Sequence, residues 1–324
     1  MNSHLQIVAN VNSRDPSRTS SLRRVFSVAM SRRINDLVKI IKTVIVNDDV
    51  FGLINPTPSY GIEVLQGMTS PGRRAYSFQR DHAKIANFMK WLQEMVDRGI
   101  LDIADITQVG ESINSAWPNK FIHQAYGKGV AKARSQLKQG GLVVPTISES
   151  GGIGAVMGQL IHLDRVGVLY TRAFNELVGI TDAMDQLISR LLAEGIVAGH
   201  SPTEIAKVLS HAITGQGSTL DLPVSYVNKK TGKVIRYVIP AKERAITLAR
   251  TEIIRAHAIG QLQEFKNWGV LGVTAKAELR TAGDDRVCEL CAGLEGVRYE
   301  IEEAMGIIPV HPKCRCIWLP FIGK

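Results

Sequence analysis

Apolar residues recur at helical spacing over most of the chain, and segments rich in glycine and proline separate the longest of these stretches. The first stripe covers residues 18–46, where arginines and lysines accompany the apolar face. Asp15 and Pro16 come before it, as a capping residue and a proline suited to the first helical turn. The pattern predicts a long basic amphipathic helix that starts at this pair and ends before a Gly/Pro-rich loop.

Three further stretches predict helices by the same criterion. Residues 85–96 carry apolar side chains at i, i+3, i+4, i+7, i+10 and i+11. Residues 118–139 place five apolar side chains on one face (Phe121, Ala125, Val130, Ala133 and Leu137). Residues 160–200 predict two helices, because a Thr-Asp pair at Thr181 has the form of a helix cap.

A capping box begins at Ser201, with proline at the first helical position and glutamate at the third, and predicts a helix to about Ile213. After this helix the spacing of apolar residues changes from helical to strand-like. Residues 224–240, VSYVNKKTGKVIRYVIP, contain two β-rich runs around a Lys/Gly turn and predict a β-hairpin. A long helix is expected to follow from Pro240, with one apolar stripe through Ile253.

These elements predict a fold that is mainly α, with a small C-terminal α+β module that is cysteine-rich and zinc-ribbon-like, and with the basic hairpin inserted at 224–240. The segment QGGLVVPTISESGG interrupts the helical pattern near residue 150. We therefore expect a helical N-terminal region over 1–150, a helical domain with the hairpin over 151–275, and a Cys/His-rich module over 276–324.

Charge adds a candidate interface. The chain of 324 residues has a formal net charge of +9, which favours a polyanionic partner such as nucleic acid. The hairpin is the most basic local stretch, and Lys229, Lys230, Lys233 and Arg236 are its candidate nucleic-acid-binding residues. The alternative is that these side chains only form a solvated hairpin tip.

The sequence shows no N-terminal targeting signal and no apolar run of the ~20 residues that a membrane span requires. The nearest candidate, GGIGAVMGQLIHL at 151–163, is short and glycine-rich, and predicts a junction leading into a helix. Its glycines have the wrong spacing for a nucleotide-binding loop. We expect a protein made in a reducing cytoplasm, where clustered cysteines are more often metal ligands than disulfides.

All four cysteines lie near the C-terminus, as Cys288 and Cys291 in one segment and Cys314 and Cys316 in VHPKCRC, beside His311. A structural zinc site needs four thiolate or imidazole ligands in a tetrahedron. Five donors are present, so four of them are expected to hold Zn²⁺, and the spacing does not decide which four. The alternatives are free buried thiols, a disulfide between the two segments, a redox site or a catalytic zinc.

No catalytic residue can be argued from the sequence, and we expect a protein that is not an enzyme. Asp284, Asp285, Arg286 and Glu295 suggest a nuclease, but no matching acid pair stands elsewhere. These acids are interpreted as solvated residues or as supports for the metal ligands. The other histidines are scattered, and no arrangement of a nucleophile with a histidine is evident.

The C-terminal half resembles the phage Mu F-like head morphogenesis family, also called minor head or minor capsid proteins. The resemblance runs through residues 177–209 and 246–270 and ends in TAGDDRVCELCAGLEGVRYEIEEAMGIIPVHPKCRCIWLP at 281–320. The last block carries its most specific motifs, D-x-R-V-C-x-x-C-x-x-L-x-G and P-x-H-P-x-C-R-C. The N-terminal 150 residues fit the family only loosely.

The resemblance implies a component of tailed-virus procapsids that is associated with the portal and with packaged DNA. Its expected partners are the portal protein, capsid or scaffold proteins and genomic DNA, and its expected location is the virion, at the head interior or portal vertex. Two other functions remain open from the residues alone. One is a DNA-binding zinc protein, sequence-independent or regulatory, and the other is a nuclease or peptidase.

Overall fold

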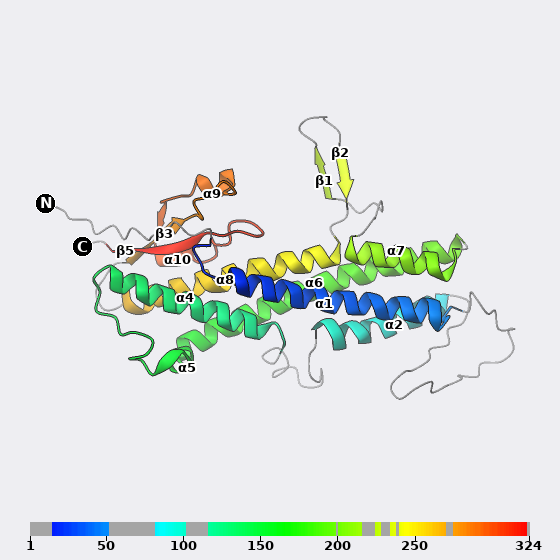
Figure 1. Cartoon of the computed structure of the whole chain (residues 1–324), viewed down its shortest axis with the longest axis horizontal. Coiled ribbons are helices and arrows are strands. Elements are labelled where there is room, and N and C mark those ends of the chain that lie inside the picture. Colours follow the sequence, from blue (N-terminus) through cyan, green and yellow to red (C-terminus); the bar gives the residue numbers. More distant parts are fainter. Residues whose placement is uncertain are drawn as a thin grey trace. The chain divides into compact units, whose positions relative to one another are not determined.

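The computed structural model describes residues 15–51, 82–101, 116–198, 200–215, 224–227, 234–237, 240–269 and 275–322. The described chain is mainly helical with a small C-terminal sheet, which confirms the predicted fold class (Figure 1). In chain order the elements are α1 (Ser20–Lys42), η1 (Thr43–Asn47), α2 (His82–Val96), η2 (Asp97–Leu101), α4 (Asn119–Gln139), α5 (Gly152–Met157), α6 (Leu160–Val197), α7 (Pro202–Thr214), β1 (Val224–Val227), β2 (Val234–Tyr237), α8 (Ala241–Gly269), β3 (Ala275–Arg280), α9 (Glu289–Ala292), β4 (Arg298–Tyr299), α10 (Ile301–Ala304) and β5 (Ile317–Ile322).

The helices α2, α4, α7 and α8 confirm the periodicity. In α4 the five apolar side chains expected to face inward are all buried. The capping box before α7 is also present: Ser201 accepts a hydrogen bond from the backbone N–H of Glu204, and the Glu204 side chain accepts one from the backbone N–H of Ser201. These elements are determined by local patterns, which explains why they were predictable.

Two helix boundaries were predicted wrongly. The first helix begins at Ser20, and Asp15 and Pro16 lie in a turn before it. Asp15 still supports the helix start, because its carboxylate accepts the backbone N–H of Ser20 (2.7 Å) and the guanidinium of Arg23 (2.8 Å). Residues 160–197 form the single helix α6, in which the Thr181 hydroxyl donates to the carbonyl of Val178 and caps nothing.

The hairpin is confirmed. Strands β1 and β2 pair antiparallel, with Val224 opposite Tyr237 and Arg236 opposite Ser225. Its candidate nucleic-acid-binding residues Lys229, Lys230 and Lys233 lie outside the described residues. The hairpin's role therefore stays a prediction.

The chain divides into two compact units, each assembled from separate stretches of sequence. One unit contains residues 1–28, 105–175 and 247–324, and the other contains residues 29–104 and 176–246. These units combine segments that are distant in the sequence, whereas the three regions expected from the sequence are consecutive. The boundaries of those three regions stay a prediction. The second unit includes a buried aromatic group in which Phe88 packs against both Phe51 and Trp91.

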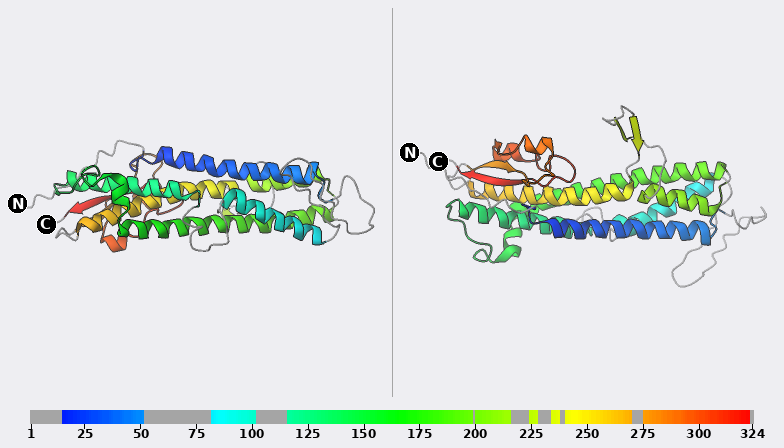
Figure 2. Two further views of the ribbon diagram at one scale, coloured as in Figure 1. Left: turned by 90° about the horizontal axis from the view of Figure 1, so that it is seen from below. Right: turned by 45° about the horizontal axis from the view of Figure 1, so that its top comes forward.

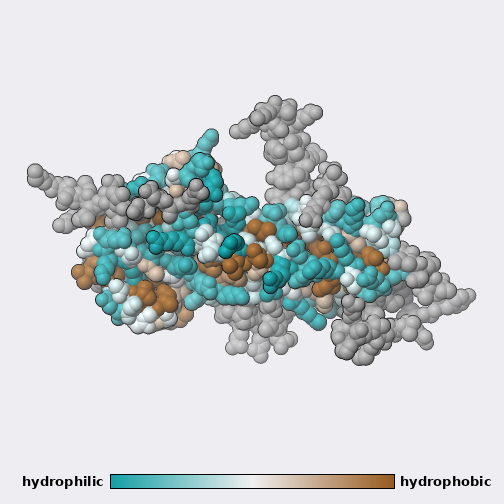
Figure 3. All heavy atoms as spheres, in the orientation of Figure 1, coloured by the Kyte–Doolittle hydropathy of each residue, from teal (hydrophilic) through white to brown (hydrophobic). Residues whose placement is uncertain are grey.

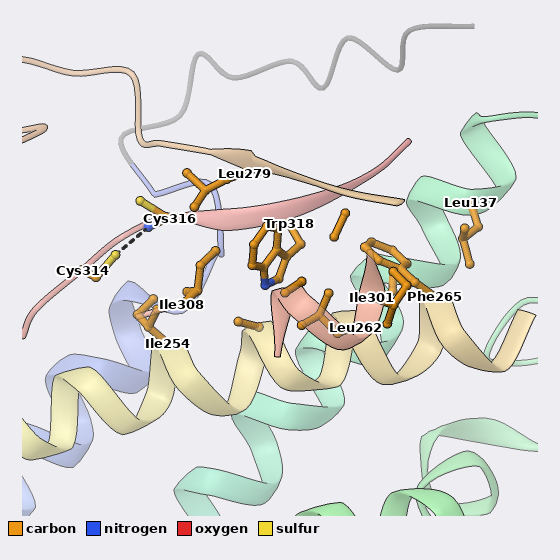
Figure 4. Close-up of a cluster of buried hydrophobic side chains, with 14 of the residues drawn as sticks. Leu137, Ile254, Leu262, Phe265, Leu279, Ile301, Ile308, Cys314, Cys316 and Trp318 are labelled. Atoms are coloured by element: carbon orange, nitrogen blue, oxygen red, sulfur yellow. Dashed lines mark hydrogen bonds between the residues drawn. The ribbon is translucent and has the colours of Figure 1, made fainter. Parts of the chain in front are cut away.

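The first unit contains the C-terminal sheet, in the order β4-β3-β5, with all strands antiparallel. Figure 2 shows β5 beside α4 and α8. The three form one hydrophobic core, in which Trp318 of β5 is fully buried with Leu137 of α4 and Leu262 of α8 (Figure 4). The Cys/His-rich module thus shares its core with helices from earlier in the chain.

Candidate metal centre

The register of the sheet sets two loops at the same end. Arg280, the last residue of β3, lies opposite Ile317, the first residue of β5. The loop that leaves β3 carries Cys288 and Cys291, and the loop that enters β5 carries His311, Cys314 and Cys316. Antiparallel pairing therefore brings together donors that are more than twenty residues apart in sequence.

The first loop presents its two sulfurs from one short helical turn. Cys288 is the N-cap residue of α9, and its sulfur accepts a hydrogen bond from the backbone N–H of Cys291 (3.4 Å). This bond satisfies an amide that the start of a helix leaves without a partner. It also fixes the sulfur of Cys288 against the turn that carries Cys291.

The second loop is a tight turn. The backbone N–H of Cys314 donates to the carbonyl of His311 (3.1 Å), and Lys313 between them has a positive φ of 64°. The backbone N–H of Cys316 donates to the sulfur of Cys314 at 3.5 Å, the bond drawn as a dashed line in Figure 4.

The donor atoms lie close together. Nε2 of His311 is 3.2 Å from Sγ of Cys288 and 3.2 Å from Sγ of Cys291, and Sγ of Cys291 is 4.0 Å from Sγ of Cys314. In a tetrahedral zinc site, ligand atoms lie about 3.5–3.8 Å from one another, given Zn–S and Zn–N bonds of about 2.3 and 2.0 Å. These three pairs therefore have spacings close to those of ligands that share one metal ion.

The five donors form two groups, in each of which all ligand atoms lie within 4.8 Å of one another: Cys288, Cys291 and His311, and Cys291, Cys314 and Cys316. Cys291 belongs to both groups. All four cysteines are free, and three of them are buried, Cys288 being exposed. The structure thus places each sequence-predicted ligand in at least one of two overlapping groups that could hold a metal ion.

The thiols differ in acidity. A hydrogen bond from the Cys316 side chain lowers the pKa of Cys314 to about 5, against the opposing effect of burial. The same hydrogen bond, together with burial, raises the pKa of Cys316 well above its usual range. Burial, with the neighbouring charge of Cys314, raises the pKa of Cys291 to about 12. Of these three thiols, Cys314 is therefore the one that most readily becomes a thiolate.

Asp284 ties the two loops together. Nη1 and Nη2 of Arg315 donate to its two carboxylate oxygens, each at 2.6 Å, and Arg286 donates to it at 2.8 Å. These bonds hold the pKa of Asp284 well below its usual range. Arg315 stands between Cys314 and Cys316, so Asp284 positions the second loop against the segment that precedes Cys288.

Glu295 also has a local structural contact. Its carboxylate accepts the backbone N–H of Thr281 (2.7 Å) and a guanidinium N–H of Arg280 (3.1 Å). The interpretation of Asp284 and Glu295 as supporting residues agrees with these bonds.

Sequence reasoning missed a buried polar network in the same unit. The hydroxyl of Tyr126 lies 2.9 Å from Nδ1 of His162, and Nε2 of His162 lies 3.3 Å from the carboxylate of Glu264. Trp268 and Arg134 also donate to Glu264. Tyr126, His162 and Glu264 are fully buried, so this network lies in the interior of the unit. His162 had the appearance of a lone histidine, because its partners come from two other helices.

Among the helices of the described residues, none has the length and apolar content to cross a membrane.

Residues 186–319, less than half of the chain, match the family model described as phage Mu protein F like protein. The match spans the end of α6, α7, the hairpin, α8 and the whole Cys/His cluster. It confirms the resemblance seen in the cysteine motifs. No curated protein and no solved structure matches the chain.

Proposed function

We propose that this chain, whose residues 186–319 match the phage Mu F-like family model, is a minor head protein of a tailed virus that acts in head morphogenesis at the portal. The single observation that carries the proposal is the family match, which suggests a component of the phage head. The proposed location is the virion, at the head interior or portal vertex. The proposed role is to connect other proteins without catalysing a reaction.

The metal cluster supports an assembly role of this kind. We propose that the metal is zinc, because soft thiolate and imidazole donors suit Zn²⁺ and a fully protein-ligated site leaves no position for a catalytic water. When bound, zinc would link the loop of Cys288 and Cys291 to the loop of His311 and Cys314. The protein would then present a rigid C-terminal surface to its partners.

An exposed apolar surface offers a candidate docking site. Around α5 and the start of α6, the side chains of Ile153, Leu160 and Leu163 are 44%, 78% and 51% exposed. Figure 3 shows a brown patch of hydrophobic residues on the surface in the region where Figure 1 places α5. Exposed apolar clusters mark protein–protein contacts more often than isolated exposed side chains do. We propose that a portal or capsid protein covers this surface.

The docking proposal is tested with a double variant, Leu160→Ser with Leu163→Ser, expressed during phage assembly. Procapsids should contain much less of this variant than of the wild type, and pull-down of the portal protein should weaken in parallel. The control is Val143→Ser, which changes another exposed apolar side chain (99% exposed) in the segment after α4. If procapsids contain as much of the double variant as of the wild type, this surface is not the docking site. Absence of the wild-type chain from procapsids would contradict the head function itself.

Contact with packaged DNA is a further part of the proposal. It rests on the net charge of +9 and on the basic sequence of the hairpin. Replacing Lys229, Lys230, Lys233 and Arg236 by glutamine should flatten the salt dependence of DNA binding without changing base preference, since phosphate contacts carry no sequence information. An unchanged slope would show that the hairpin does not contact DNA.

A further inference from the structure

We infer that the ligands are Sγ of Cys288, Sγ of Cys291, Nε2 of His311 and Sγ of Cys314, and that Cys316 is a hydrogen-bonding neighbour of the site and not a ligand. The inference rests on the metal centre proposed above and selects four of its five donors. The competing set consists of the four cysteines and leaves His311 outside. The geometry of the two loops favours the first set.

The first argument concerns the orientation of His311. Nδ1 of its ring lies 2.8 Å from the carbonyl oxygen of Pro312. A carbonyl can only accept, so Nδ1 carries the proton and Nε2 bears the lone pair. Nε2 lies 3.2 Å from the sulfur of Cys288 and 3.2 Å from the sulfur of Cys291. A histidine whose second ring nitrogen donates to a backbone carbonyl is the usual arrangement at a metal.

The second argument concerns which sulfurs accept a hydrogen bond that would stabilise them as thiolates. Sγ of Cys288 accepts the backbone N–H of Cys291, and Sγ of Cys314 accepts the backbone N–H of Cys316. Such bonds strengthen when the sulfur is a thiolate, the form that binds metal. Among the hydrogen bonds of the described residues, no backbone N–H donates to the sulfur of Cys316 or to that of Cys291, so this argument separates Cys288 and Cys314 from the other two thiols. Cys291 is assigned as a ligand by its distances of 3.2 Å to Nε2 of His311 and 4.0 Å to Sγ of Cys314.

The third argument is the repeated form of the two loops. Cys288 and Cys291 are separated by two residues, and so are His311 and Cys314. Each pair lies on one turn that a hydrogen bond between the two residues closes. Two turns of the same size facing each other supply four ligands without the participation of Cys316.

The position of Cys316 gives it a different role. It directly precedes β5 and stands two residues from Trp318, so in extended chain the two side chains share a face. Trp318 is fully buried in the core, and Cys316 is only 3% exposed beside it (Figure 4). The thiol of Cys316 therefore lies between the hydrophobic core and the metal site, close to the sulfur of Cys314.

The test compares the full chain with two variants, Cys316→Ala and His311→Ala. Each protein is loaded with Zn²⁺ for metal analysis and with Co²⁺ as a spectroscopic probe, because the sulfur-to-cobalt charge-transfer band reports the number of thiolate ligands. We expect the wild type and Cys316→Ala to bind one metal per chain with the same band intensity. His311→Ala should bind at least roughly 10-fold more weakly.

Loss of the metal or of band intensity in Cys316→Ala would overturn the assignment, and so would an unchanged spectrum and affinity in His311→Ala. Circular dichroism tests whether Cys316→Ala is folded, which we expect because the substitution replaces one small buried side chain with another. This variant therefore decides the question even if His311→Ala does not fold. A wild-type chain that takes up neither metal would instead remove the metal centre itself. The two failures are thus distinguishable.

Discussion

Gly129 of α4 lies directly against the backbone carbonyl of His257 of α8, so that a methyl group at Gly129 would overlap the carbonyl oxygen. Gly260 makes the reciprocal approach from α8, against the backbone of Tyr126. The two helices are therefore in backbone contact where a side chain would hold them apart. This contact positions α4 and α8 beneath the C-terminal sheet, because both helices contribute to the core around Trp318.

Gly129→Ala should destabilise the protein although alanine is the better helix former. Separating the two backbones costs about 1–3 kcal/mol or more, which exceeds the gain of about 1 kcal/mol in helix propensity. The measurement is the free energy of unfolding in urea. The matched control is Gly127→Ala on the same helix, where the new methyl group meets the side chains of Ile153 (3.6 Å) and Met157 (3.8 Å) at ordinary contact distances and should be neutral or stabilising. Equal effects of the two substitutions would contradict the backbone contact.

Glu264→Gln should lower the free energy of unfolding by about 3–5 kcal/mol, because it leaves the buried charge of Arg134 without its counter-charge. The side chains of this pair are 0% and 5% exposed. The control is Glu194→Gln, which removes a surface pair with Arg190 at 3.8 Å and should cost no more than about 0.5 kcal/mol. Similar costs for the two variants would show that the buried pair contributes no more than a surface pair.

The buried network also predicts acid sensitivity. Burial alone would raise the pKa of Glu264, but hydrogen bonds from His162 and Trp268 and the charge of Arg134 hold the pKa below its usual value. A carboxyl with a lowered folded-state pKa stabilises the protein fully above its unfolded pKa of about 4.5, and this contribution is lost as the pH falls through the folded-state value. Urea unfolding at pH 5 and pH 3 should show a smaller loss in Glu264→Gln than in the wild type.

His257 predicts a second dependence at milder pH. Its side chain is 1% exposed, and burial, together with the positive charge of Lys132, lowers its pKa to about 3. The folded protein therefore keeps the ring neutral while the unfolded chain protonates it below about pH 6.5. Stability from this group is complete above pH 6.5 and falls by up to about 1.4 kcal/mol per pH unit as the pH decreases toward 3. His257→Gln should lack this slope between pH 6 and pH 4, and parallel curves for the two proteins would contradict the assignment.

Asp284→Asn should weaken zinc binding by roughly 10-fold, because residues that orient the metal loops affect affinity without touching the metal. The substitution replaces one acceptor oxygen of the bidentate contact with Arg315. Competition with a chromogenic chelator measures the affinity. Asp285→Asn is the control, since the neighbouring side chain is exposed. Equal affinities of the two variants would show that the contact between Asp284 and Arg315 does not support the site.

Some parts of the fold were predictable because their causes are local. The apolar period of α4, the capping box at Ser201 and the pairing of β1 with β2 each depend on residues that lie close together in the sequence. The helix break expected at Thr181 was wrong because that prediction considered only the local form of the sequence. A Thr-Asp pair has the local form of a cap, but buried Leu177, Ile180 and Met184 continue one apolar stripe through it, and packing of that stripe keeps α6 continuous.

For the candidate site, the sequence by itself determined which donors are available and how they are spaced within each loop, because those are properties of short segments. Only the tertiary structure decided that Nε2 of His311 faces Cys288 and Cys291, since this depends on the register that sets Arg280 opposite Ile317. The need for glycine at position 129 was likewise invisible in the sequence. It arises from the carbonyl of His257, a group that only the packing of two helices places there.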